Sequence, residues 1–90
     1  MKPFKWNELK NERLKLTRGV SFQEIVKSKY IRTVEHPQRT NQEVMLFEYK
    51  DYVWAVPFVE QENEIFLKTA YPSRKHTKLY RRGFYEKKKD

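Results

Sequence analysis

The sequence contains no cysteine and only two glycines among its 90 residues. Without cysteine, the chain can form neither a disulfide framework nor a zinc site with Cys ligands. No apolar run approaches the roughly 18 residues of a membrane span, and the first residues lack the apolar segment of a secretion signal. We therefore expect a small cytoplasmic protein without membrane contact, with one domain over residues 1–83 and a basic, frayed tail over residues 84–90.

Negative charge is scarce in the first and last parts of the chain. Residues 1–40 hold ten Lys/Arg against four Asp/Glu, residues 41–70 hold two against six, and residues 71–90 hold eight against two. The formal net charge of +8 therefore combines two basic parts with an acidic middle. This pattern indicates a polyanion site, although a solvated lysine-rich surface would show the same charge. Together with 16% aromatic residues, it favours nucleic acid as the ligand.

Two helices are predicted near the start of the chain, after a short edge strand at residues 4–6. The first helix covers residues 8–18, with Asn7 as its N-cap, leucines at helical spacing and Gly19 just past its end. The second covers residues 22–27 and begins in a capping box with the sequence SFQE.

The middle of the chain is predicted to form an antiparallel meander. Four segments rich in β-branched and aromatic residues are separated by short polar connections, at residues 30–35, 44–49, 52–59 and 64–70. The third segment is almost wholly apolar, which is typical of a central strand covered on both faces. Because Pro57 removes a ladder donor from this strand, we expect a bulge or a locally unpaired edge there.

The last predicted element is a basic helix over residues 73–82, entered through a turn at residues 71–73 and followed by Gly83. The predicted architecture is therefore an α+β domain, in which two N-terminal helices and a C-terminal helix pack on an antiparallel sheet. From the end of the fourth strand through the last helix, cations alternate with aromatic rings, as a ligand with a phosphate backbone requires. This basic segment comprises Lys68, Tyr71, Arg74, Lys75, His76, Lys78, Tyr80, Arg81 and Arg82.

Several short motifs in this order resemble a known family. They are Phe-x-Trp-Asn at residues 4–7, RGVSFQE at residues 18–24 and YPSRK at residues 71–75, with the antiparallel sheet between the last two. Over about residues 4–83 the chain is similar to the BrnT-type toxins of bacterial type II toxin–antitoxin modules, within the RelE-like superfamily. It departs from the family pattern at Ser73, which directly precedes Arg74 where BrnT-like sequences usually have a small residue between the two.

The resemblance implies a RelE-like fold and a metal-independent endoribonuclease that cleaves mRNA, free or on the ribosome. It also implies a cognate antitoxin that holds the toxin inactive, and operator DNA that is bound only through the toxin–antitoxin complex. The residues themselves suggest no cofactor, because His36 stands alone and no His, Asp and Glu spacing is typical of a metal site.

Metal-free RNA cleavage uses the ribose 2′-OH to attack the adjacent phosphorus, and it requires a base, an acid and positive charge beside the phosphate oxygens. The catalytic candidates are Lys68, Arg74, Lys75 and His76. Lys68 and Arg74 flank the predicted turn and could clamp one phosphate, unless Arg74 is only a solvated cation of the first helical turn. Lys75 could hold the RNA backbone or lie free on the surface. His76 suits proton transfer by its unperturbed pKa of about 6.5, but histidine on the inner face of a helix is often a packed residue.

The RNA-binding candidates are Tyr71, Lys78, Tyr80, Arg81 and Arg82. Tyr71, in the predicted turn, is the better candidate for base stacking or proton donation, whereas Tyr80 is expected in the core. Two other functions remain open for the same segment. One is a non-catalytic nucleic-acid-binding domain, and the other is an inactive relative of the toxins that serves as a co-repressor partner.

Overall fold

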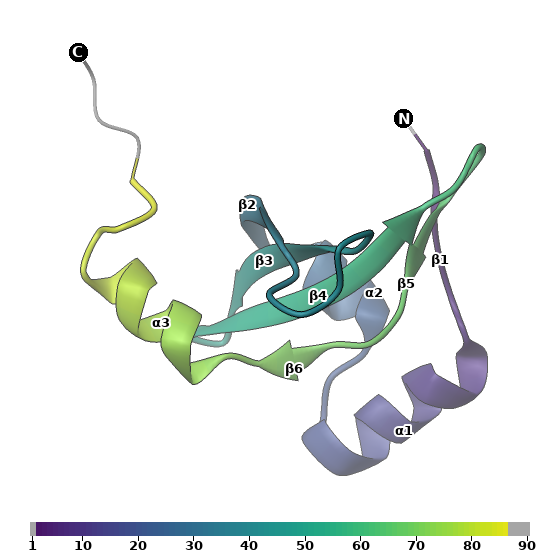
Figure 1. Ribbon diagram of the computed structural model, residues 1–90. Helices are drawn as coiled ribbons and strands as arrows, with labels where there is room; N and C mark the ends of the chain where they lie inside the picture. Colours follow the sequence, from purple (N-terminus) through teal and green to yellow (C-terminus); the bar gives the residue numbers. More distant parts are fainter. Residues whose placement is uncertain (1, 87–90) are drawn as a thin grey trace.

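The structure is a computed structural model that describes residues 2–86. Three helices and six strands follow one another along the chain (Figure 1). In order they are β1 (Phe4–Trp6), α1 (Glu8–Arg18), α2 (Phe22–Val26), β2 (Lys29–Glu35), β3 (Glu43–Tyr49), β4 (Tyr52–Glu60), β5 (Ile65–Leu67), β6 (Tyr71–Pro72) and α3 (Arg74–Arg81). Within residues 2–86, no helix is long and apolar enough to span a membrane.

The caps predicted for the first two helices are present. The Asn7 side chain accepts a backbone N–H of the first turn of α1, and Gly19 ends this helix in the left-handed conformation, at φ 70°. In α2, the Ser21 hydroxyl accepts the Glu24 N–H at 3.1 Å, and the Glu24 carboxylate accepts the Ser21 N–H at 2.9 Å. This capping box is the one predicted from SFQE, and α2 ends one residue before the predicted bound.

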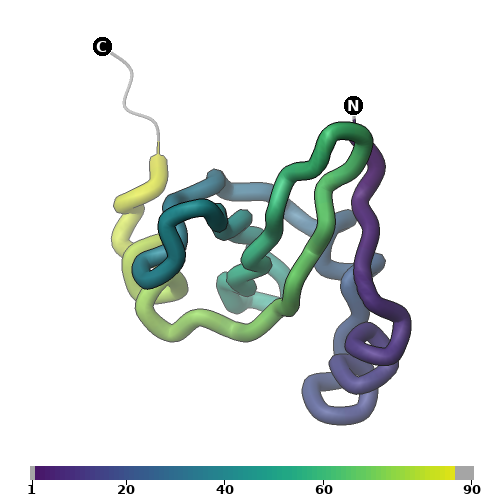
Figure 2. Tube along the Cα trace, turned by 45° about the vertical axis from the view of Figure 1, so that its right-hand side comes forward, coloured from purple at the N-terminus to yellow at the C-terminus, as the bar shows by residue number. Residues whose placement is uncertain are grey.

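The sheet has the strand order β1-β5-β4-β3-β2, and β6 also pairs with β4. The strands from β2 to β5 form the predicted antiparallel meander, while β1 lies parallel to β5, beside it in both views (Figures 1 and 2). The prediction of a central β4 is confirmed, since it pairs with β3 on one side and with β5 and β6 on the other.

Pro57 sits where the outer partner of β4 changes from β5 to β6. The Pro57 carbonyl accepts the Lys68 N–H at 2.8 Å, so it points away from β3. Because the N–H and C=O of one residue in an antiparallel strand point to the same side, the donor that proline lacks would also point away from β3. The pairing of β4 with β3 runs through Pro57 without a shift of register. Of the two predicted alternatives, the interrupted edge is therefore present and the bulge is absent from this pairing.

Two predictions about the segment after β4 are wrong. The fourth strand ends at Leu67 rather than at residue 70, and residues 71–72 form the short strand β6 instead of a turn. Local pattern does not distinguish these states, because the ladder that residues 71–72 join belongs to β4, far away in the sequence.

Helices cover both faces of the sheet. One core contains Phe22 and Ile25 of α2 and Leu14 of α1, packed against Trp54 and Val56 of β4. The alternate positions of β3 and β4 face the second core, beneath α3. This second core contains Val44, Leu46, Val53, Ala55 and Tyr85, with Ile31, Val34, Leu79 and Tyr80 at its margin.

Two details of the helices and the tail differ from expectation. The leucines whose spacing predicts α1, Leu9 and Leu16, are 78% and 87% exposed, and the buried face of α1 carries Asn11 and Leu14 instead. In the tail predicted to fray from residue 84, Phe84 is exposed but Tyr85 is buried. The remaining tail residues, 87–90, lie outside the described residues.

Candidate nucleic-acid interface

The basic segment is stretched along β4 instead of folding into one turn. Leu67 lies opposite Phe58, whereas Pro72 lies opposite Trp54, four residues further along β4. At about 3.3 Å per residue, this separates the two ends of the connection by roughly 13 Å. Lys68 therefore follows β5, while the next cations begin beyond β6, on α3 (Figure 1). The expectation that two cations flank one tight turn is wrong.

The first turn of α3 is exposed and cationic. The Ser73 hydroxyl caps the helix by accepting the His76 N–H at 3.1 Å. Arg74 and Lys75 follow in the first turn with exposed side chains, and Lys78 is exposed one turn later. A cation in the first turn opposes the helix dipole, so Arg74 does not gain stability from its position.

His76, on α3, is half-buried against the segment that follows this helix. Its Nδ1 atom is hydrogen-bonded to the hydroxyl of Tyr85, which is buried. Burial lowers the pKa of His76 below its ordinary value, and the charge of Lys75 lowers it further. Burial also raises the pKa of Tyr85, which keeps the phenol protonated. This environment is that of a packed histidine.

Tyr80 and Arg81 anchor the end of α3 to the sheet. The Tyr80 hydroxyl donates a hydrogen bond to the Glu48 carboxylate at 2.7 Å, and the Arg81 guanidinium donates one to the Asp51 carbonyl at 2.9 Å. Tyr80 also packs at the margin of the second core, as expected for a core residue.

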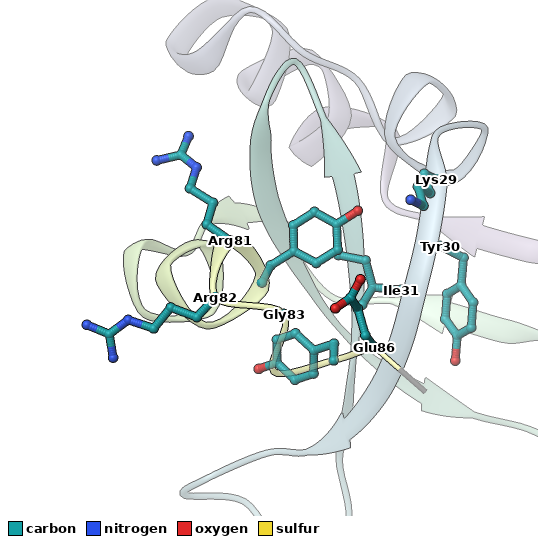
Figure 3. Close-up of a pocket in the computed structure, with 9 residues that line it drawn as sticks. Lys29, Tyr30, Ile31, Arg81, Arg82, Gly83 and Glu86 are labelled. Carbon is teal, nitrogen blue, oxygen red and sulfur yellow. The ribbon is translucent and has the colours of Figure 1, made fainter. Parts of the chain in front are cut away.

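A cavity of about 520 Å³ lies between β2 and the end of α3 (Figure 3). Figure 3 shows the side chains of Arg81 and Arg82 extending away from this cavity, while Glu86 and Lys29 also line it. The lining is thus of mixed charge, and its arginines are directed outward.

Three adjoining hollows lie where α1 meets the β5–β6 connection and the β2–β3 loop. Their volumes are about 450, 250 and 350 Å³, and all three share Lys10. Among the described residues that line them, none is acidic. We call this surface the basic cleft, after its cations Lys10, Arg13, Arg18, Arg39 and Lys68, which it combines with His36 and Tyr71.

Backbone contacts hold Lys68 and Tyr71 in the cleft. The Lys68 N–H is bonded to the carbonyl of Pro57, and Pro57 itself lines the cleft. Tyr71 pairs with Ala55, so the side chains of Tyr71 and Ala55 lie on the same face of the sheet. Pro57 is two residues from Ala55 on β4 and therefore lies on this face as well. Tyr71 is 38% exposed, which leaves part of its ring open to a ligand.

His36 enters the cleft from the β2–β3 loop, which lies over the sheet in Figure 1. The His36 N–H donates to the Gln42 carbonyl at 3.0 Å, and its Nδ1 atom accepts the Gln38 N–H at 3.1 Å. With Nδ1 used as an acceptor, a neutral His36 carries its proton on Nε2 and offers an N–H donor. Nowhere in residues 2–86 do three or more His, Asp or Glu side chains gather as metal ligands would.

Comparison with known proteins identifies the fold. The sequence matches no protein-family model and no curated protein. A solved structure does match: the 1.1 Å crystal structure of the Brucella abortus ribonuclease toxin BrnT, at 15% sequence identity and a TM-score of 0.54. The match covers 81% of this chain and 97% of that chain. The chain has the BrnT fold. The α+β architecture and the family resemblance predicted from short motifs are thus confirmed at the level of the fold.

The BrnT fold brings together residues that sequence reasoning did not connect. Because β1 pairs with β5 and places Trp6 opposite Leu67, the start of α1 and Lys68 follow side by side. This parallel pairing spans some 60 residues, and no local pattern signals it. Consequently Lys10 and Arg13 are not among the candidates predicted from the sequence, and His36 is considered there only as a solitary histidine.

Proposed function

We propose that the protein is a metal-independent endoribonuclease that cleaves mRNA and is neutralised by a cognate antitoxin. The observation that carries this proposal is the basic cleft, in a chain with the fold of a ribonuclease toxin. Five cations without a lining carboxylate favour a polyanion over any neutral or cationic ligand. The adjacent rings of Tyr71 and His36 can stack on bases or donate protons.

In the proposed reaction, the ribose 2′-OH gives its proton to solvent water as the 2′ oxygen bonds to the adjacent phosphorus. The bond to the 5′ oxygen breaks, which yields a cyclic phosphate and a free 5′-OH. The developing negative charge on the phosphate oxygens lies against Lys68, Arg13 and Arg39. His36 donates its Nε2–H to one of these oxygens, and the Tyr71 hydroxyl passes a proton to the leaving 5′ oxygen. As a base, His36 would have to give up its bond from Gln38, so the arrangement favours its role as a donor.

The α3 cations belong to the same proposal with a different role. Arg74, Lys75 and Lys78 are exposed beyond β6, where they extend the positive surface from the cleft towards the incoming RNA. His76 is held by Tyr85, and we assign it to the packing of α3. An antitoxin that covers the basic cleft would block the RNA, and operator DNA would be bound through that complex.

Inducible expression in bacteria tests the proposal with the wild-type chain, Lys68→Met and Arg74→Ala. Wild-type expression is expected to arrest growth and shorten transcripts. Lys68→Met should relieve the arrest, since loss of one transition-state donor lowers a rate by about 100- to 1,000-fold. Arg74→Ala should weaken RNA binding more than it slows cleavage, and therefore relieve the arrest only in part.

The outcomes separate the proposed function from its alternatives. Relief by Arg74→Ala alone would move the chemistry from the cleft to the start of α3. Healthy growth with intact mRNA, at confirmed expression of folded wild-type protein, would contradict the ribonuclease. RNA binding by that inactive protein would then favour a non-catalytic nucleic-acid-binding domain, and binding only together with an antitoxin would favour a co-repressor partner.

A further inference from the structure

One of the three hollows differs from the other two in its lining. It has a volume of about 350 Å³ and lies between the first turns of α1 and the face of β5. Its residues are Asn7, Leu9, Lys10, Arg13, Phe66 and Lys68. Cations thus surround an aromatic ring and an aliphatic side chain, and Leu9 is 78% exposed. An exposed leucine and a half-buried phenylalanine in one hollow form an apolar surface, which phosphate groups would not contact favourably.

Strand alternation explains why the Phe66 ring faces this hollow. Ile65 and Leu67 pack in the core beneath α1 and α2, so Phe66 between them is turned to the opposite face of β5. Lys68 lies on the same face, and its ammonium group is 5.9 Å from the centroid of the Phe66 ring. The ring therefore has a cation beside it and an aliphatic side chain from α1 on the far wall of the hollow.

We propose that this hollow is a nucleobase subsite, in which one base of a single-stranded RNA stacks on Phe66 and contacts Leu9. The proposal rests on the proposed function, because the strand is the one whose phosphates occupy the basic cleft. The cations of this hollow, Lys10, Arg13 and Lys68, also line one or both of the adjoining hollows. A single-stranded RNA can therefore place a phosphate on these cations and the base of the same nucleotide on the Phe66 ring. The volume lies at the lower end of the about 300–1,000 Å³ of small-ligand pockets, which suits one nucleotide.

Binding of two matched oligomers tests the subsite. One is a fluorescein-labelled eight-nucleotide 2′-O-methyl RNA, which cannot be cleaved by 2′-OH attack, and the other is an abasic strand of the same length. Phe66→Ala should lower the affinity for the RNA by about 5- to 100-fold, the range expected for one base–aromatic stack. The same variant should bind the abasic strand within about twofold of wild type. Phe66→Leu, which keeps apolar volume in the strand, should show the same selective loss, and Phe66→Tyr should retain affinity.

A variant that removes a cation controls for the contribution of charge, and thermal melting controls for folding. Lys10→Gln is expected to lower the affinity for both strands, because it removes a phosphate contact shared by both. Thermal melts of the Phe66 variants show whether the compared proteins are folded, and Phe66→Leu carries the test if Phe66→Ala is not.

Three outcomes would overturn the proposal. Equal losses for the RNA and the abasic strand would make Phe66 a structural residue, and no loss for either would place the base elsewhere, with Tyr71 the next candidate. If the wild-type protein bound neither oligomer, the hollow would not be an RNA subsite, and a protein partner would be the next candidate ligand. Cleavage of unmodified RNA by the wild type is measured separately, so base-dependent binding stands even if the chain proves inactive as a nuclease.

Discussion

The half-buried His76 makes the stability of the fold depend on pH. Burial lowers its folded-state pKa below the ordinary value of 6.5, so the unfolded chain binds a proton more readily than the folded chain. The stability that the neutral imidazole contributes is therefore fully present above pH 6.5 and is lost as the pH falls through the lower, folded-state pKa. We expect the melting temperature to fall on acidification from pH 7.5 to 5, and His76→Gln to reduce this fall.

Melting curves from circular dichroism across this pH range provide the measurement. His36→Gln is the matched control, because it removes the other histidine and leaves the contact between His76 and Tyr85 in place. An unchanged pH dependence in His76→Gln would show that groups other than His76 set the response in this range. Glu24 is not one of them, because the backbone N–H of Ser21 lowers the pKa of its carboxylate below the ordinary value.

At the scale of single residues, the sequence indicates which residue types could bind a polyanion, but it does not indicate which of them lie close together. Lys68 and Tyr71 were candidates from their residue types, and both line the basic cleft. Arg39 and His36 were not, because a polar loop shows no pattern that tells which surface it will cover. Composition indicated a polyanion as the ligand, but only the packed chain shows which cations line the same surface.

At the scale of elements, α1 offers a direct test of which face packs. Leu14 is 6% exposed and belongs to the core, whereas Leu16 is 87% exposed. Leu14→Ala is expected to lower the free energy of unfolding by about 2–5 kcal/mol, as for other buried leucines. Leu16→Ala should change it by less than about 0.5 kcal/mol. Urea denaturation of both variants measures the difference, and equal destabilisation would mean that the outer leucines are packed.

Element bounds were predictable where a local signal sets them. Asn7, Gly19 and the capping box set both ends of α1 and the start of α2 through bonds within a few residues, and these three bounds agree with the prediction. The end of β5 depends instead on β4, which changes its partner at Pro57. Where a distant strand determines the end of a strand, the local sequence pattern does not predict that end.

At the scale of the whole molecule, the uneven charge becomes one basic surface through folding. The parallel pairing of β1 with β5 joins the basic N-terminal part of the chain to Lys68, although the middle of the sequence is acidic. Within residues 2–86, no acidic residue lines the cleft. Glu60, for instance, forms an ion pair with Lys2 at the far end of β4. The net charge of +8 therefore understates how positive the cleft is.

This concentration of charge predicts where the salt dependence of RNA binding arises. The double variant Lys10→Gln with Arg13→Gln should reduce the slope of log affinity against log salt by about 1.4, at roughly 0.7 for each single-strand phosphate contact. Lys15→Gln with Lys27→Gln removes the same charge outside the cleft, from an exposed position of α1 and from the exposed C-cap of α2, and should change the slope much less. Arg81→Gln with Arg82→Gln tests the end of α3 in the same way. Titration of the 2′-O-methyl RNA at several salt concentrations gives all four slopes. A larger change for the α3 pair than for the cleft pair would move the RNA path to the arginines that point outward from the end of α3.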